Sequence, residues 1–363
     1  MAAYLVRRLL LIIPTLLGIM LINFLIVQAA PGGPIEQLIA QLTQPGQQAT
    51  DTITRSGSDV IDTGSGNGTQ GGYRGRQGVL PEYIKELEVQ YGFDKPLVDR
   101  FLKMLGDYVT LDFGKSFFRD ESVVQLVIDK MPVSISLGVW TTLLVYLISI
   151  PLGIRKALKD GSKFDIWTSA ILAVGVAIPS YLFAVLLLVV FAGGSYVQWF
   201  PLAGLVSDNW HDLPLGGQIV DYLWHMVLPV FAMVIGGFAS LAMLTKNSFL
   251  DQLHQQYVIT ARAKGLPEKR VLYGHVFRNA MLIVISGFPA AFIGILFTGS
   301  VLVEIIFSLD GLGLLGYEAV MRRDYPVMFG TLFVFSLVGL LLNILGDFTY
   351  TLIDPRIDFA RRA

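Results

Sequence analysis

The amino-acid sequence predicts an all-α polytopic membrane protein with six transmembrane helices and both termini inside the cell. Three observations predict this fold. The chain of 363 residues is 53% hydrophobic and only 15% charged, which is too apolar for a soluble protein of this length. Its apolar runs are long enough to cross a bilayer as helices. Its basic residues gather in alternate connecting segments, as expected when those segments lie on the cytoplasmic side.

The composition also excludes several kinds of chemistry. The chain has no cysteine, which rules out disulfides, thiolate metal sites and cysteine catalysis. None of its four histidines stands at a metal-ligand spacing from another. A net charge of −1 gives no reason to expect nucleic acid as a partner. We therefore predict no catalytic residue, no metal site and no cofactor site in this chain.

Residues 1–30 are predicted to form the N-terminal tail and the first transmembrane helix. Arg7 and Arg8 precede an apolar run that extends to about Ala30. This run is longer than the apolar region of a signal peptide, which is about 7–15 residues. We therefore expect a span that is retained in the mature protein.

Residues 31–131 are predicted to form an extracytoplasmic region between the first two spans. Residues 44–79 are rich in Gly, Ser, Thr and Gln and have almost no large apolar residues, so we expect a mobile loop there. Order is expected to return before the second span. Leu97, Phe101, Leu105 and Tyr108 have the spacing of one helical face.

Residues 132–363 are predicted to form a core of five spans, at about 132–154, 165–192, 222–245, 280–303 and 327–346. Fifteen of the 27 Lys and Arg residues fall in the segments assigned to the inside, and two fall in the short outside loops. No Asp, Glu, Lys or Arg lies in the central part of any span, so we expect the driving force to come from another protein. Prolines occur in or at the start of spans two to five, as kinks or as ordinary packing residues; they are Pro132, Pro151, Pro179, Pro229 and Pro289.

The longest polar interruption in the second half of the chain is residues 246–279, which carry six Lys and Arg residues including Lys246. Val258, Ala261 and Gly265 share one face of a short predicted helix, which Gly265 ends. Pro267 and Glu268 have the positions expected at the start of a second helix. Two short helices with a tight joint suit docking against another protein.

A resemblance to a known family rests on two strings in this segment, YVITARAKG at 257–265 and HVFRNA at 275–280. They are similar to the coupling loop of ABC importer permeases, above all of the dipeptide/oligopeptide branch. The wider family has Glu-Ala-Ala, three residues and then Gly. Here Ile259 replaces the Glu of that pattern and Thr260 replaces its first Ala. Any ion pair that the Glu makes in other members therefore cannot be assumed here.

The resemblance extends along nearly the whole chain. It includes RRL at 7–9, PGGP at 31–34, EIIFS at 304–308, RDYP at 323–326 and DPR at 354–356. The Gly-rich insertion and the string FAGGSY at 191–196 are most similar to the Yej group of this family. Members of that group take up oligopeptides, including peptide-nucleotide antibiotics of the microcin C type.

The resemblance implies a permease subunit of an ATP-driven peptide importer in the bacterial inner membrane. Its implied partners are a second homologous permease, an ABC ATPase with two fused nucleotide-binding domains and a periplasmic peptide-binding protein. ATP and Mg²⁺ would be bound by the ATPase, since this chain has no phosphate-binding loop of the GxxxxGK[ST] type. The ATPase would dock on a short segment that comprises Tyr257, Thr260, Ala261, Arg262, Ala263, Lys264 and Gly265.

Three acidic residues, Glu304, Asp310 and Asp324, are predicted at the outer mouth. They would contact a peptide or the binding protein, or would simply be solvated. The 44–79 loop is either a tolerated insertion or a segment that reaches into the binding protein. A stand-alone channel or a secondary carrier remains the alternative function. The sequence shows neither a filter-like loop nor a midplane ionisable site to favour it.

Overall fold

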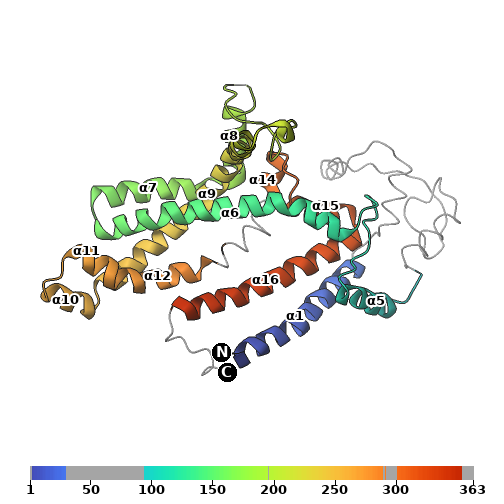
Figure 1. Cartoon of the computed structure of the whole chain (residues 1–363), viewed down its shortest axis with the longest axis horizontal. Helices are drawn as coiled ribbons and strands as arrows, with labels where there is room; N and C mark the ends of the chain where they lie inside the picture. The colour runs from blue at the N-terminus through green and yellow to red at the C-terminus, as the bar shows by residue number, and fades with distance from the viewer. Residues whose placement is uncertain (1, 30–93, 195, 289–290, 292–300, 354–363) are drawn as a thin grey trace, which may run out of the picture. The chain divides into compact units, whose positions relative to one another are not determined.

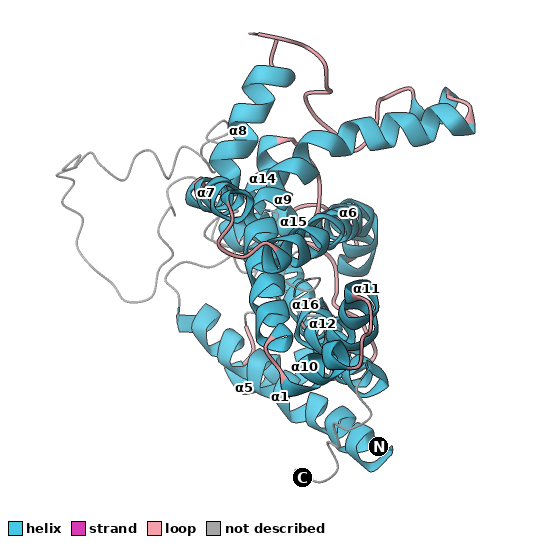
Figure 2. Cartoon of the chain, turned by 90° about the vertical axis from the view of Figure 1, so that its left-hand side faces the viewer, coloured by secondary structure: helices cyan, strands magenta, loops and turns pink. Residues whose placement is uncertain are grey.

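The computed structural model describes residues 2–29, 94–194, 196–288, 291 and 301–353. Within these ranges the chain is built from helices and their connections, and the only strand-like pairing is an isolated bridge between Lys115 and Ser122 (Figure 2). This agrees with the predicted all-α class. The 44–79 loop, the C-terminal DPR string and residues 289–290 and 292–300 of the fifth predicted span lie outside the described residues.

Four described helices are long and apolar enough to cross a membrane. They are α1 (Ala2–Ala29), α6 (Val123–Leu158), α9 (Leu215–Leu253) and α16 (Tyr325–Ile353) (Figure 1). A bent pair of helices would make a fifth span. Of the predicted span at 280–303, α12 (Phe277–Ser286) is the main described part. The count of six and the inside position of both termini remain predictions.

The third predicted span, at 165–192, is broken in the structure. It consists of α7 (Lys163–Ala177) and α8 (Ser180–Phe191), whose axes differ by 91°. Pro179 has no backbone N–H to continue the helix and it forces Ile178 into an extended conformation, with φ −89° and ψ 117°. The sequence left open whether the prolines in the spans are kinks or ordinary packing residues. Pro179 lies at a kink.

The described residues divide into two compact units. In the first, which spans Lys130–Leu315 together with short segments from both ends of the chain, α9 is the central helix. Helices α7, α8 and α12 pack on it, and so does α14 (Val301–Ile306). The core between them is apolar, with fully buried residues such as Leu137, Phe249 and Val284.

The second unit spans Leu11–Asp129 and Gly316–Ser336. Its described part contains most of α1, α5 (Leu97–Val109), most of α15 (Leu312–Arg322) and the start of α16. Aromatic rings hold it together. Phe24 lies 5.2 Å from Phe101, and Tyr108 lies 4.8 Å from Phe113, between ring centroids. Helix α5 confirms the helix that the apolar spacing predicts at Leu97–Tyr108.

Candidate functional site

The predicted joint between two short helices is present in the first unit. Helix α10 (Gln256–Ala263) ends where Gly265 adopts a left-handed φ of 76°. The N–H of Gly265 donates to the Arg262 carbonyl at 2.9 Å, and that of Leu266 donates to the Ala261 carbonyl at 3.3 Å. These two bonds form a Schellman motif, which satisfies the last carbonyls of a helix. Glycine is needed here for its backbone conformation, since a Cβ at Gly265 would meet only open space.

The second short helix, α11 (Glu268–Val271), begins directly after Pro267 and has Glu268 in its first turn, as predicted. It continues into η2, a π-helical turn (Leu272–Val276), and then into α12. The Arg262 guanidinium binds the Glu268 carboxylate across the joint, at 2.8 and 3.3 Å. The joint between α10 and α11 is therefore closed by both backbone and side-chain contacts. We call residues 256–276 the coupling segment.

The coupling segment has an inner and an outer face. Val258, Ala261 and Val271 are buried in the core of the first unit. Ala261 was predicted as a small residue that a partner approaches. Its burial instead gives it a packing role within this chain. The outer face presents the exposed side chains of Ile259, Thr260, Ala263, Lys264 and Tyr273. Tyr257 is half-buried, and its hydroxyl donates to Gln252 Oε1 at 2.8 Å.

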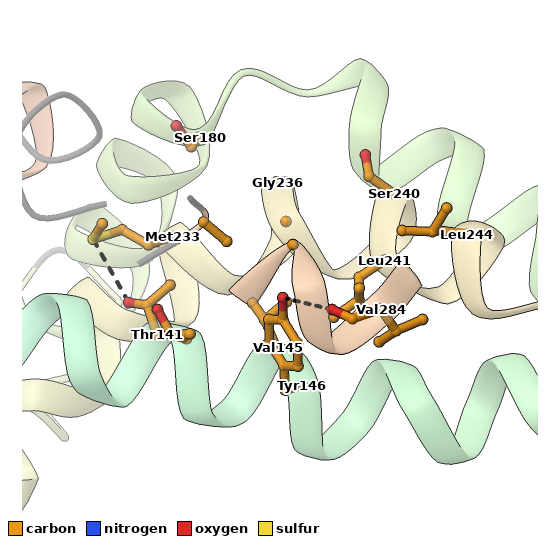
Figure 3. A pocket seen from close by; sticks show the side chains of 14 residues that line it. Thr141, Val145, Tyr146, Ser180, Met233, Gly236, Ser240, Leu241, Leu244 and Val284 are labelled. Atoms are coloured by element: carbon orange, nitrogen blue, oxygen red, sulfur yellow. Dashed lines mark hydrogen bonds between the residues drawn. The ribbon is translucent and has the colours of Figure 1, made fainter. Parts of the chain in front are cut away.

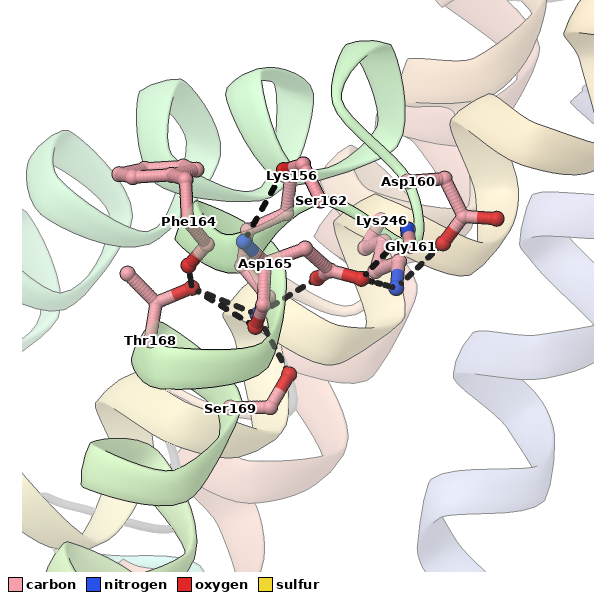
Figure 4. A network of polar contacts seen from close by, with 9 residues as sticks. All are labelled: Lys156, Asp160, Gly161, Ser162, Phe164, Asp165, Thr168, Ser169 and Lys246. Carbon is pink, nitrogen blue, oxygen red and sulfur yellow. Dashed lines mark hydrogen bonds and ion pairs between the residues drawn. The ribbon is translucent and has the colours of Figure 1, made fainter.

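Two lysines that the sequence assigns to basic loops are buried instead. Helix α9 continues to Leu253, so Lys246 lies inside it rather than in a loop. Lys156 lies in the last turn of α6 and is completely buried. Both lysines bind Asp165 at the start of α7 (Figure 4). The positive-inside rule counts basic residues but does not consider their partners, so it missed this cluster.

The contacts of this cluster are well formed. Lys156 Nζ lies 2.9 Å from Asp165 Oδ1 and also donates to the Thr168 and Ser169 hydroxyls, at 2.9 and 2.7 Å. Lys246 Nζ lies 2.6 Å from Asp165 Oδ2 and 2.7 Å from Asp160 Oδ1. Two cations thus meet two carboxylates, and the turn between α6 and α7 is fixed to α9. We call Lys156, Asp160, Asp165 and Lys246 the ion cluster. In the sequence, the signal that could have revealed the ion cluster is the presence of two acidic residues, Asp160 and Asp165, shortly after Lys156.

Close packing near the ion cluster brings α6 and α9 together. A Cβ built on Gly153 would lie 2.6 Å from Thr245 Cβ and 2.7 Å from the Ala242 carbonyl oxygen. Only glycine allows this approach, as is common where membrane helices cross. The C-terminal half of α9 is therefore attached to α6 by packing and to α7 by charge, just before the coupling segment begins.

A pocket of about 530 Å³ lies between α6, α8, α9 and α12 in the same unit (Figure 3). Its walls are mainly apolar, and the hydroxyl-bearing residues Thr141, Thr142, Tyr146, Ser180 and Ser240 interrupt them. None of its lining residues is charged. The buried Thr142 hydroxyl has no hydrogen-bond partner among the described residues. The pocket can thus offer hydroxyl contacts to a bound molecule, and no charged side chain among its lining residues contacts that molecule.

The three acidic residues predicted at the outer mouth occupy different environments. Glu304 is completely buried, which corrects its predicted place at an exposed mouth. Its carboxylate accepts hydrogen bonds from the Leu314 N–H at 2.6 Å and from the Ser134 hydroxyl at 3.5 Å. In the sequence Glu304 directly follows the apolar run of the fifth predicted span, so it resembled a residue at the end of a span. In the structure the segment after Glu304 folds back, so that the Leu314 N–H reaches its carboxylate.

The other two acidic residues differ in exposure. Asp310 is more than half exposed and is paired with Lys130. Asp324, in the second unit, is buried and accepts hydrogen bonds from the Ser116 hydroxyl and from the Phe117 N–H, the latter at 3.2 Å. Burial raises the pKa of the Asp324 carboxyl. Of the three, only Asp310 has a largely solvent-exposed side chain.

The fold and these features define a helical membrane protein with a pocket between its helices. Residues 149–359 match the family described as the binding-protein-dependent transport system inner membrane component. The chain belongs to this family and is a permease component of an ABC importer of the peptide type, a multi-pass protein of the inner membrane.

Curated relatives match over their full length. The chain is 59% identical to the peptidoglycan transport system permease protein YejB of Agrobacterium fabrum, over all of both chains. It is 60% identical to the inner membrane ABC transporter permease protein YejB of Escherichia coli O157:H7, again over all of both. It is 33% identical to the oligopeptide transport system permease protein AppB of Bacillus subtilis, over 99% of this chain and 100% of that one. The resemblance to peptide permeases, and to the Yej group within them, is thereby confirmed.

Proposed function

We propose that this chain forms half of the translocation path of an ATP-driven importer for oligopeptides. The observation that carries the proposal is that the chain is similar over its full length to permeases of the peptide type. An uncharged pocket between the helices of the first unit supports it. A permease that passes many peptides must tolerate different side chains. Uncharged walls with scattered hydroxyls suit that task, because they neither bind nor exclude a particular charge.

The coupling segment is the proposed contact for the ATPase. The Schellman motif and the Arg262–Glu268 ion pair make its joint stiff, so a push on the outer face would move α10 and α11 together. The ion cluster and the close packing at Gly153 would then pass the motion from α9 to α6 and α7. A coupled shift of packed helices is a common way to change access to a site. Thr260, Ala263, Lys264 and Ile259 are the residues we assign to direct contact.

The remaining parts of the machine are proposed from the family. They are a second homologous permease, an ATPase with two fused nucleotide-binding domains that binds ATP and Mg²⁺, and a periplasmic peptide-binding protein. Both ends of this chain would lie in the cytoplasm. Residues 44–79 would reach the binding protein, and exposed Asp310 is the acidic residue best placed to meet a partner at the outer mouth.

Three candidate substrate classes can be compared directly. One relative is named for oligopeptide transport and another for peptidoglycan transport. Short peptides and peptide-bearing fragments of the cell wall share a peptide backbone, which the pocket hydroxyls would bind. Peptide antibiotics of the microcin C type are a third candidate with the same backbone. Uptake of each, in cells that contain or lack this chain, would rank them.

The proposed path can be tested by single-cysteine labelling, because the natural chain has no cysteine. Ser240→Cys and Leu244→Cys place thiols in the pocket. In the assembled importer both should react with a charged, water-soluble thiol reagent. Added peptide should slow the reaction, and trapping the ATPase with ATP and vanadate should change its rate.

Two matched controls accompany the labelling. Ser149→Cys lies in a completely buried position outside the pocket, and Ile171→Cys lies on the exposed apolar surface of α7. Neither should show protection by peptide. A pocket thiol that never reacts, or that reacts without regard to peptide and nucleotide, would refute the proposed path. Transport by the purified chain alone would instead indicate a channel or a secondary carrier.

A further inference from the structure

A second pocket, of about 460 Å³, lies in the second unit and takes no part in the proposed path. Its walls come from the C-terminal end of α1, from α5, from the segment after α5 and from the start of α16. Buried rings form its apolar side; they belong to Phe24, Tyr108, Phe113, Tyr325 and Phe329. Phe24 and Phe329 each belong to a helix that can span a membrane.

The other side of this pocket is cationic. Four basic side chains line it, against two acidic ones; they are Lys95, Arg100, Lys103 and Lys115 against Asp107 and Asp112. One acidic group is already engaged, because Asp112 Oδ1 accepts from the Gly114 N–H at 3.0 Å. Lys115 is drawn toward Asp120, at 3.1 Å. Arg100 and Lys103 lie one helical turn apart on α5 and carry two of these four positive charges.

A buried amide also lies in this pocket. Gln28 is near the C-terminal end of α1, and its Oε1 accepts from the Arg100 guanidinium at 3.4 Å. Its Nε2 is buried and has no hydrogen-bond partner within the described part of the chain. A buried donor without a partner is unfavourable, because it has lost its hydrogen bonds to water. An acceptor that enters beside Arg100 would relieve this.

The depth of the pocket in the membrane follows from its two spans. The span in α1 ends at Ile26, just before Gln28, and the span in α16 begins at Tyr325. Both ends line the pocket, so it lies where the hydrocarbon layer meets water. Phe24 and Phe329 lie within these spans, whereas Arg100 and Lys103 lie outside them, on α5. Basic residues beside a span end attract the anionic head groups of lipids by charge.

We propose that this pocket binds an anionic phospholipid. The phosphate would lie between Arg100 and Lys103 and accept a hydrogen bond from Gln28 Nε2. The upper part of an acyl chain would pack on Phe24 and Phe329. The proposal is independent of the importer's substrate, since it concerns only the second unit.

The test uses the purified full-length chain in a neutral detergent, with binding of phosphatidylglycerol followed by native mass spectrometry. Phosphatidylcholine and glycerol phosphate serve as comparison ligands. The variant Arg100→Gln with Lys103→Gln should lose affinity for phosphatidylglycerol by on the order of fivefold for each cation removed. The charge-preserving variant Arg100→Lys with Lys103→Arg should keep most of it. Lys264→Gln with Lys269→Gln removes two exposed cations from the coupling segment and should leave the affinity for phosphatidylglycerol unchanged.

Each outcome is decisive. Selective loss in the Arg100 and Lys103 variant, with retention in the charge-preserving one, supports the lipid site. Equal binding of phosphatidylcholine, or equal loss in the Lys264 and Lys269 variant, would overturn it. Glycerol phosphate that binds as tightly as the lipid would show a site for small anions instead. If the Arg100 and Lys103 variant kept its affinity for phosphatidylglycerol, these cations would not bind the lipid and the proposal would be overturned.

Discussion

Lys246 Nζ lies between two carboxylates, 2.6 Å from Asp165 Oδ2 and 2.7 Å from Asp160 Oδ1. One ammonium of α9 thus holds the turn that joins α6 to α7, while Lys156 holds Asp165 from the other side. Removing one partner of a buried ion pair leaves a buried charge uncompensated, which is more damaging than replacing the whole pair. The ion cluster therefore makes a specific prediction about stability.

Asp165→Asn should destabilise the chain strongly. It removes the carboxylate that Lys156 and Lys246 share, and breaking such a pair reduces stability by about 3–5 kcal/mol. The measurement is the thermal midpoint of the purified chain in detergent. Lys163→Gln, an exposed position in the same turn of α7, is the matched control and should change it little. The triple variant Asp165→Leu, Lys156→Met and Lys246→Met should recover part of the loss. An unchanged midpoint in Asp165→Asn would show that the cluster contributes nothing.

The joint of the coupling segment predicts a contrast between two glycines. Gly265→Ala forces a side chain into a left-handed conformation, which is unfavourable by roughly 1–2 kcal/mol. Gly274→Ala lies in a helical turn with open space around it and should be neutral. Gly265→Asn should be intermediate, since Asn tolerates this conformation.

The readout is the amount of ATPase that co-purifies with this chain in mild detergent, compared at equal expression. We expect a clear decrease for Gly265→Ala and none for Gly274→Ala. If both variants retained the ATPase fully, the shape of the joint would not matter for docking. If both variants lost the ATPase, docking would be sensitive to any change on the outer face. The left-handed backbone of Gly265 would then not explain the loss.

Local signals in the sequence predicted the coupling joint well. Gly265, Pro267 and Glu268 act through the backbone within a few residues of themselves, so their spacing is enough to place two helix ends. Helix α5 was also predicted from local spacing, since its apolar residues recur within a few positions of one another. The ion cluster was missed because Lys246 is far from Asp165 in sequence and its partner is fixed only by packing. Glu304 was misplaced for a similar reason, since Ser134 and the Leu314 N–H meet it only after the chain folds back.

The buried Asp324 predicts a pH dependence. Burial raises its pKa above the ordinary 3.8, so the folded chain holds this proton to a higher pH than the unfolded chain does. Stability from this group is therefore greatest at low pH and falls as the pH rises from about 3.8 through the raised value. Asp324→Asn should remove that fall. Ser116→Ala deletes a donor to the carboxylate, raises the pKa further and should extend the fall to higher pH. Thermal midpoints measured across the acidic range would show both effects; a profile that Asp324→Asn leaves unchanged would contradict them.

Glu304 and Gly311 predict a strong coupling in a double-mutant cycle. A Cβ at Gly311 would lie 2.6 Å from both Cδ and Oε1 of Glu304, and the three nearest atoms all belong to this carboxyl group. Gly311→Ala should thus destabilise the chain by forcing the carboxylate away from the Leu314 N–H. Overpacking of this kind typically reduces stability by about 1–3 kcal/mol. Glu304→Ala alone should reduce it by a similar amount, about 1–3 kcal/mol, because it leaves the part-buried Leu314 N–H without its acceptor.

The double variant separates steric conflict from a general fragility of this region. With Glu304 truncated, the new methyl group at 311 has space, so the two changes together should be less damaging than their sum by roughly 0.5–3 kcal/mol. Gly216→Ala, where a Cβ meets nothing within 4 Å, should instead add to Glu304→Ala without coupling. Unfolding in detergent, followed by tryptophan fluorescence, gives the four free energies needed. Simple additivity of Glu304→Ala and Gly311→Ala would mean that the carboxylate does not occupy this position. Glu304 would then be free to face the outer mouth, as its sequence context first indicated.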